Sequence, residues 1–196
     1  MKNIFILTLC GCFLLLSACD EEPTVAERAG RPKQAFDVAG YLDEEVRSLA
    51  GQPVTVRKTV LEEGKAKEMK TFRSLNWSNE LASFAEIDLN KPALVGLFEQ
   101  EETTNQAGHT VRRYTAKDGA KTNVKEAVYT FNGQGELLQI DATIWQENML
   151  FETLKQMHLQ LQPNAVPRLQ RYRLEETQEL LFMDAEQYGV EGVVLR

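Results

Sequence analysis

Apolar residues recur at steps of three and four positions over residues 33–50, which is the spacing of the buried face of an amphipathic α-helix. A Gly-Gln-Pro sequence at residues 51–53 ends the pattern, because glycine and proline both terminate helices. The sequence therefore predicts an N-terminal amphipathic helix over residues 33–50. Its expected buried face consists of Phe36, Ala39, Leu42, Val46 and Leu49.

A second, short helix is expected to start within residues 76–81. Ser78 is its expected N-cap, because a serine side chain accepts a hydrogen bond from the first turn of a helix. A Leu-Asn-Lys-Pro sequence at residues 89–92 is expected to end it. Its predicted buried residues are Trp77, Leu81 and Phe84.

Strands are expected over most of the remaining chain. Residues 53–60 and 69–72 flank a Glu63-Gly64 turn, which predicts a hairpin. The other short apolar or alternating runs bounded by turn residues predict further strands. These runs are residues 94–98, 109–114, 124–131, 172–174, 180–183 and 190–195.

The clearest strand follows a hairpin turn at residues 132–135, Asn-Gly-Gln-Gly, and alternates apolar with polar positions over residues 138–144. Such alternation indicates one buried and one wet face. Residues 150–161 fit both helix and strand spacing, and a strand is favoured because both neighbours are strands. Together these patterns predict an α+β fold, an antiparallel β-sheet meander with the N-terminal amphipathic helix and a second short helix packed on one face.

The N-terminal segment has the features of an export signal. An apolar run over residues 4–16 follows Lys2 and is shorter than the roughly 20 residues that a spanning helix needs. Residues 16–19, Leu-Ser-Ala-Cys, then resemble the lipobox of bacterial lipoproteins at every position. The resemblance implies diacylglycerol on the sulfur of Cys19, cleavage before this residue and acylation of the new amine. Two or three acyl chains make a stable anchor. The alternative interpretation of residues 1–19 is an ordinary secretory signal with a chance cysteine.

The expected organisation has three parts. Residues 1–18 form the signal peptide, residues 19–32 the lipidated cysteine and a flexible tether, and residues 33–196 a single domain. Asp20, directly after the cysteine, resembles an inner-membrane retention signal of enterobacteria, and the acidic cluster at residues 20–22 resembles a surface-export signal of Bacteroidota-type lipoproteins. The alternative is a solvated tether. The expected location is the cell envelope, periplasmic or surface-facing, with the choice of membrane left open.

Charge and cysteine content narrow the possible functions. The net charge of −7 at pH 7 argues against nucleic-acid binding, because phosphate backbones attract basic surfaces. The three cysteines, Cys10, Cys12 and Cys19, all lie at or before the lipobox. Disulfides, cysteine catalysis and cysteine-bound metal are therefore excluded for the domain itself.

No residue constellation predicts an enzyme, a metal site or a cofactor. His109 and His158 lie far apart in the sequence and are expected at the surface. No Gly-x-Ser-x-Gly sequence occurs, so a serine hydrolase is not indicated. Trp145 falls on the polar side of the strand over residues 138–144. An aromatic residue there can mark a partner surface, or be covered by a helix or a second sheet face.

The mature chain also resembles a set of small envelope lipoproteins of the Bacteroidota type. This resemblance implies an envelope protein and transfers no active residue. We therefore expect a membrane-anchored, non-catalytic lipoprotein that binds an envelope protein partner or helps to assemble a complex; the alternative is a carrier or sensor of an apolar ligand within a curved sheet. The residues that carry the resemblance are Phe36-Asp37, Tyr41-Leu42, Trp77, Glu80-Leu81, Phe84, residues 88–92, residues 172–178 and Gly192.

Overall fold

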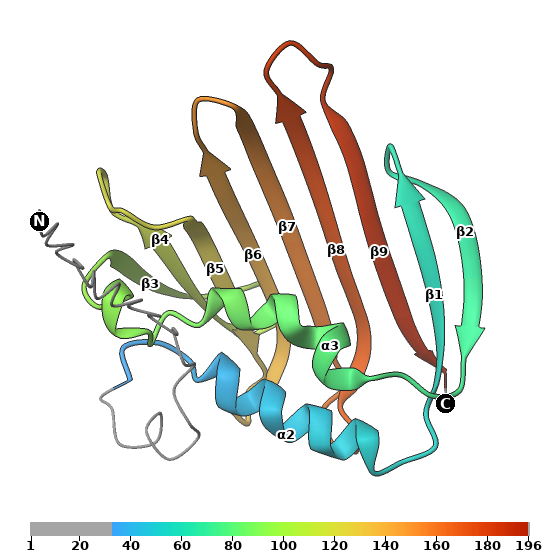
Figure 1. Ribbon diagram of the computed structural model, residues 1–196. Helices are drawn as coiled ribbons and strands as arrows, with labels where there is room; N and C mark the ends of the chain where they lie inside the picture. The colour runs from blue at the N-terminus through green and yellow to red at the C-terminus, as the bar shows by residue number, and fades with distance from the viewer. Residues whose placement is uncertain (1–32, 196) are drawn as a thin grey trace, which may run out of the picture. The chain divides into compact units, whose positions relative to one another are not determined.

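The computed structural model describes residues 33–195 (Figure 1). The expected signal peptide, Cys19 and the expected tether over residues 20–32 lie outside the described residues. Within the described part, no helix has the length and apolar character that crossing a membrane requires.

A single open sheet of nine strands dominates the domain. The strand order is β2-β1-β9-β8-β7-β6-β5-β4-β3, and every neighbouring pair is antiparallel. Strands β3 to β9 therefore form a consecutive meander, which the β1–β2 hairpin extends beside β9. The strands are β1 Thr55–Glu62, β2 Lys65–Phe72, β3 Phe98–Thr104, β4 Thr110–Ala116, β5 Val124–Phe131, β6 Leu137–Glu147, β7 Phe151–Leu161, β8 Leu169–Leu180 and β9 Glu186–Leu195.

The helices lie together on one face of this sheet (Figure 1). Because β2 and β3 are the two opposite edges, the chain between them has to cross the whole sheet, and the short helices form on this crossing. The observed fold confirms the predicted α+β meander with helices on one face. The helical elements are α2 Val38–Ala50, α3 Trp77–Leu81, and the 3-10 turns η1 Ala82–Ile87 and η2 Pro92–Leu94.

The core fills the space between these helices and the sheet. Phe84 of η1 and Leu49 of α2 are fully buried against Tyr129 of β5 and Ile140 of β6. Burying one such side chain contributes about 1.5–3 kcal/mol. The opposite face of the sheet carries no helix, and we call it the outer face.

Tyr172 of β8 joins the crossing segment to the sheet. Its ring lies over Gly192 of β9, where an added Cβ would fall 2.0 Å from the ring. The Tyr172 hydroxyl donates to Glu80 of α3, which also forms an ion pair of 2.7 Å with Lys58 of β1. Burial, together with the hydrogen bond to the Glu80 carboxylate, raises the pKa of Tyr172. This network holds α3 against three strands.

Two helix boundaries differ from the predicted ones. The first helix begins at Val38 instead of residue 33, because the Asp37 side chain accepts the Gly40 N–H (3.1 Å) and caps it there. The second helix is capped by Asn76, whose side chain accepts the Asn79 N–H at 3.1 Å, and not by Ser78. Asp37 therefore starts the first helix later than the apolar spacing indicates, and Asn76 caps the second helix two residues before the expected Ser78.

Three strand predictions are corrected as well. The strand expected at residues 94–98 is replaced by η2 and a turn, since proline at its start favours a helical turn. Leu137 is buried instead of Leu138, because an irregularity at Phe131 shifts the register. Strand β8 ends at Leu180, so most of the apolar run over residues 180–183 lies in a turn. The strand favoured at residues 150–161 is confirmed by β7.

Candidate functional site

The two histidines do not come together. His109 lies in the turn between β3 and β4, whereas His158 lies on β7, and β5 and β6 separate the two places. His158 Nδ1 lies 2.7 Å from Asp141 Oδ1 of the neighbouring strand. The described residues include no group of three or more His, Cys, Asp or Glu side chains that could hold a metal ion.

His158 and Asp141 border a shallow hollow of about 300 Å³ on the outer face. Burial alone would raise the pKa of Asp141, but hydrogen bonds from His158 and Gln139 and nearby positive charge outweigh it, so the pKa is lowered. Arg173 closes one side of the hollow with a two-pronged ion pair to Glu175 (2.7 and 2.8 Å). These charged groups satisfy one another, which indicates a structural role for this hollow.

A second hollow of about 520 Å³ lies where the crossing segment meets the sheet. The ion pair between Lys155 of β7 and Glu86 of η1, at 2.9 Å, spans it. Lys91 and Lys121 also line it, so charged groups border much of its wall. An apolar ligand would have to desolvate these charges, which is costly.

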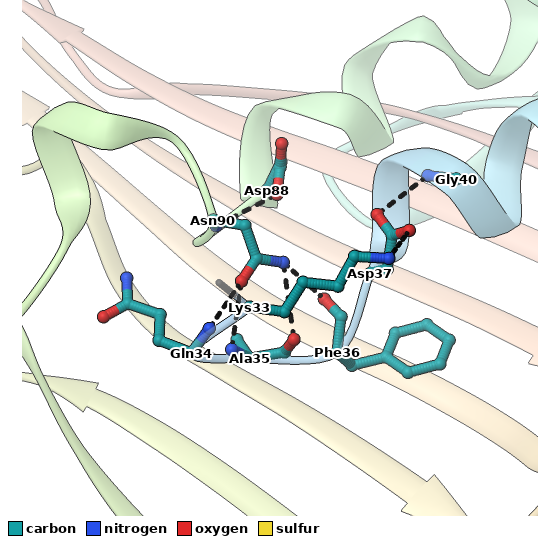
Figure 2. Close-up of polar contacts among 8 residues, drawn as sticks. All are labelled: Lys33, Gln34, Ala35, Phe36, Asp37, Gly40, Asp88 and Asn90. Carbon is teal, nitrogen blue, oxygen red and sulfur yellow. Dashed lines mark hydrogen bonds and ion pairs between the residues drawn. The ribbon is translucent and has the colours of Figure 1, made fainter. Parts of the chain in front are cut away.

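A polar clasp fixes the place where the domain begins (Figure 2). The Asn90 side-chain oxygen accepts the backbone N–H groups of Gln34 and Ala35, each at 3.0 Å. Its amide nitrogen donates to the carbonyls of Ala35 and Phe36 at 3.4 and 3.2 Å. Asp88 in turn accepts the backbone N–H of Asn90 at 3.0 Å. The chain that leads back toward Cys19 therefore leaves the domain at a defined position.

Several exposed apolar side chains gather at the turns of two neighbouring hairpins, β6–β7 and β8–β9, and Figure 1 shows these turns at the same end of the sheet. Met149 is 91% exposed and Phe182 is 96% exposed, which is unusual for side chains of this size. Exposed apolar groups that gather in one place mark interaction sites more often than scattered ones. The gathered residues, which we call the tip cluster, are Met149, Leu150, Leu181, Phe182 and Met183.

The two tips are ordered and joined. The Leu181 N–H donates to the Leu150 carbonyl at 2.9 Å, which ties one turn to the other. The Asn148 side chain accepts the N–H groups of Leu150 and Phe151 at 2.8 and 3.1 Å and shapes the first turn. The tip cluster is therefore a preorganised surface, and ordering it on binding costs little.

Trp145 extends apolar character from the tips onto the outer face. It is 38% exposed and lies opposite Leu154 of β7, which is exposed to a similar degree. The Lys125 ammonium lies 5.2 Å from the Trp145 ring centre and covers part of it. No helix of the described part covers this face, so the sequence-based expectation of a partner surface at Trp145 remains open.

Comparison with known proteins finds no matching protein family, no matching curated protein and no matching solved structure. The function is therefore argued from the surface of this chain. Sequence patterns missed the tip cluster because an apolar run at residues 180–183 looks like a strand. The available signal was the lack of alternation in four consecutive large apolar residues, followed at once by Asp184.

Proposed function

We propose that this chain is a membrane-anchored cell-envelope lipoprotein with a non-catalytic binding or assembly role, and that the tip cluster is its binding surface. The observation that carries the proposal is the gathering of five large, exposed apolar side chains on two hairpins joined by a hydrogen bond. The lipobox resemblance at Cys19 supports the anchor.

The free energy of burying the tip cluster favours the binding of a partner at this surface. Removing five such side chains from water contributes on the order of 10 kcal/mol at about 1.5–3 kcal/mol each. Association costs roughly 4–15 kcal/mol in lost freedom of motion. The tip cluster therefore offsets most of that cost, and modest additional contacts make a stable complex.

The test compares assemblies formed in the envelope by the full-length protein and its variants. A double variant, Met149→Ser with Phe182→Asn, removes the two most exposed members of the tip cluster. Val95→Ser is the matched control, because Val95 is 60% exposed but lies in the loop before β3. Detergent-solubilised envelopes are then separated by size on native gels.

Wild type and Val95→Ser are expected in a species larger than the monomer, and the double variant at monomer size. A wild-type protein that migrates as a monomer, or a double variant that migrates with wild type, contradicts the proposal. Circular dichroism of the purified variants verifies that each one is folded.

A further inference from the structure

Near their tips, the two hairpins that carry the tip cluster contain acidic residues but no lysine or arginine; Lys155, Arg171 and Arg173 lie farther along their strands. No lysine or arginine occurs over residues 126–154 or 174–195. Glu147, Glu152 and Glu179 are exposed and lie directly opposite one another on adjacent strands, and we call them the acidic row. Asp184 and Glu186 add two exposed carboxylates beside the tip of β8–β9.

The acidic row is electrostatically unfavourable in the isolated domain. Like charges placed directly opposite on neighbouring strands repel each other. Among the described residues, none of the three carboxylates of the row takes part in an ion pair. A basic surface placed against the row would relieve this repulsion at the same time as an apolar surface covers the tip cluster.

The domain's starting point lies toward the other end of the strands. Phe36, which follows the clasped residues, packs against Phe131 with ring centres 5.6 Å apart, and Phe131 pairs with Leu137 at the start of β6. Strand β6 then runs 11 residues toward the tips, or about 33 Å at roughly 3.3 Å per residue. Figure 1 shows α2 at the bottom of the view and both tips at the top.

The separation between the domain's starting point and the tips argues against the proposed anchoring membrane as the partner that covers the tip cluster. The tips lie at the end of the strands remote from the residues at which the described domain begins. Their carboxylates are also repelled by anionic lipid, which attracts basic segments.

A second copy is disfavoured by charge. A symmetric tip-to-tip dimer places the same patch of both copies in contact. Each acidic row would then face another acidic row, and no lysine or arginine lies within residues 126–154 or 174–195 to separate them.

We infer that the tip cluster and the acidic row together bind a different protein, one that offers an apolar cleft rimmed by lysine or arginine, at the end of the strands remote from the start of the described domain. The inference rests on the proposed function and names the chemistry of the partner at the same surface. Phe182 and Met149 enter the cleft, and the acidic row contacts its basic rim.

The experiment places a photo-crosslinking residue, p-benzoylphenylalanine, at position 182 of the full-length protein in intact envelopes. The same residue at position 95 is the matched control, because Val95 is exposed outside the two hairpins. We expect one discrete protein adduct from position 182 and none from position 95. Mass spectrometry is expected to map the adduct to a partner peptide in which apolar residues are flanked by lysine or arginine.

Charge variants test the basic rim separately. Glu152→Lys combined with Glu179→Lys is expected to lower the adduct yield by about tenfold or more, because it turns attraction into repulsion. Glu44→Lys combined with Asp118→Lys changes the net charge equally at exposed positions outside the hairpins and is expected to leave the yield unchanged. Raising the salt concentration is expected to lower the wild-type yield, since exposed charge pairs are screened.

The other outcomes separate the two proposals. A phospholipid adduct or a homodimer adduct at position 182 overturns the inferred partner. A protein adduct that is insensitive to charge reversal and salt, or that maps to a peptide without basic residues, overturns the basic rim but leaves the proposed function standing. No discrete adduct at position 182 overturns both.

Discussion

Phe182 combines full exposure with an uncommon backbone conformation. Its φ angle is +66°, in the left-handed region that bulky residues rarely adopt, and its side chain is 96% exposed. This backbone conformation costs roughly 1–3 kcal/mol of folding free energy. The Phe182 ring, being almost fully exposed, does not pack against the rest of the domain. The position therefore fits a role in contacting something outside the domain.

We predict that Phe182→Asn does not destabilise the domain, because asparagine tolerates the left-handed region and no buried contact is lost. The free energy of unfolding, measured by urea denaturation, is expected to stay equal or to rise by up to about 1 kcal/mol. A decrease of more than this amount would mean that the ring packs against the domain.

Asp141 is expected to make the stability of the domain depend on pH in the acid range. The pKa of Asp141 is lowered in the folded state. Its contribution to the free energy of unfolding is therefore fully present above the pKa of an unfolded aspartate, about 3.9. The contribution is lost as the pH falls through the lower folded value. Asp141→Asn is therefore expected to flatten the loss of stability below about pH 4. Asp118→Asn, in the exposed β4–β5 turn, is the control and is expected to follow wild type.

At the scale of elements, α2 is fastened to the sheet by a buried carboxylate. Glu45 is 5% exposed, and its side chain accepts the Leu169 N–H of β8 at 2.7 Å. Glu45→Ala removes this acceptor in a buried place and is expected to cost about 1–3 kcal/mol in urea denaturation. Glu45→Gln retains an acceptor oxygen and is expected to lose clearly less; equal losses would show that the hydrogen bond contributes nothing.

The Asn90 clasp defines the entry of the chain into α2. Asn90→Ala removes the acceptor for two backbone N–H groups, those of Gln34 and Ala35. Amide exchange at these two positions is expected to accelerate strongly, while exchange in the centre of β6 and β7 stays slow. Asn90→Asp keeps the acceptor and is expected to protect both amides. Unchanged exchange in Asn90→Ala would contradict the clasp.

Most elements of this fold follow from local patterns. Alternation and the Asn-Gly-Gln-Gly turn predict β5 and β6 because a half-buried strand and a tight hairpin each leave a short-range signal. The pairing of β1 with β9 joins the two ends of the domain and leaves no such signal. The tip cluster escaped prediction for a related reason, because an apolar run signals burial unless its tertiary surroundings are known.

At the scale of the molecule, the tip cluster and the start of the described chain at the Asn90 clasp lie toward opposite ends of the long strands. The charged groups in the middle of the outer face pair with one another, Arg173 with Glu175 and His158 with Asp141. The apolar tips are the surface for which the domain itself provides no partner.

The proposed anchor depends on one thiol, that of Cys19, which gives the last prediction. Diacylglycerol is joined through sulfur, so Cys19→Ser, which keeps size and polarity but loses that nucleophile, is expected to leave an unlipidated and uncleaved precursor. Wild-type protein is expected to incorporate labelled fatty acid and to begin at a blocked residue 19. The variant is expected to take up no label and to retain residues 1–18, whose apolar run still enters the membrane.

The folded domain offers an internal control for this experiment. The described domain begins at residue 33, well after Cys19 in the sequence, so the free energy of unfolding is expected to be equal in wild type and Cys19→Ser. Equal fatty-acid labelling of the two proteins, or a wild-type N-terminus other than Cys19, would contradict the proposed lipid anchor. The proposed role of the tip cluster does not depend on this anchor, because it is argued from exposed side chains of the described domain.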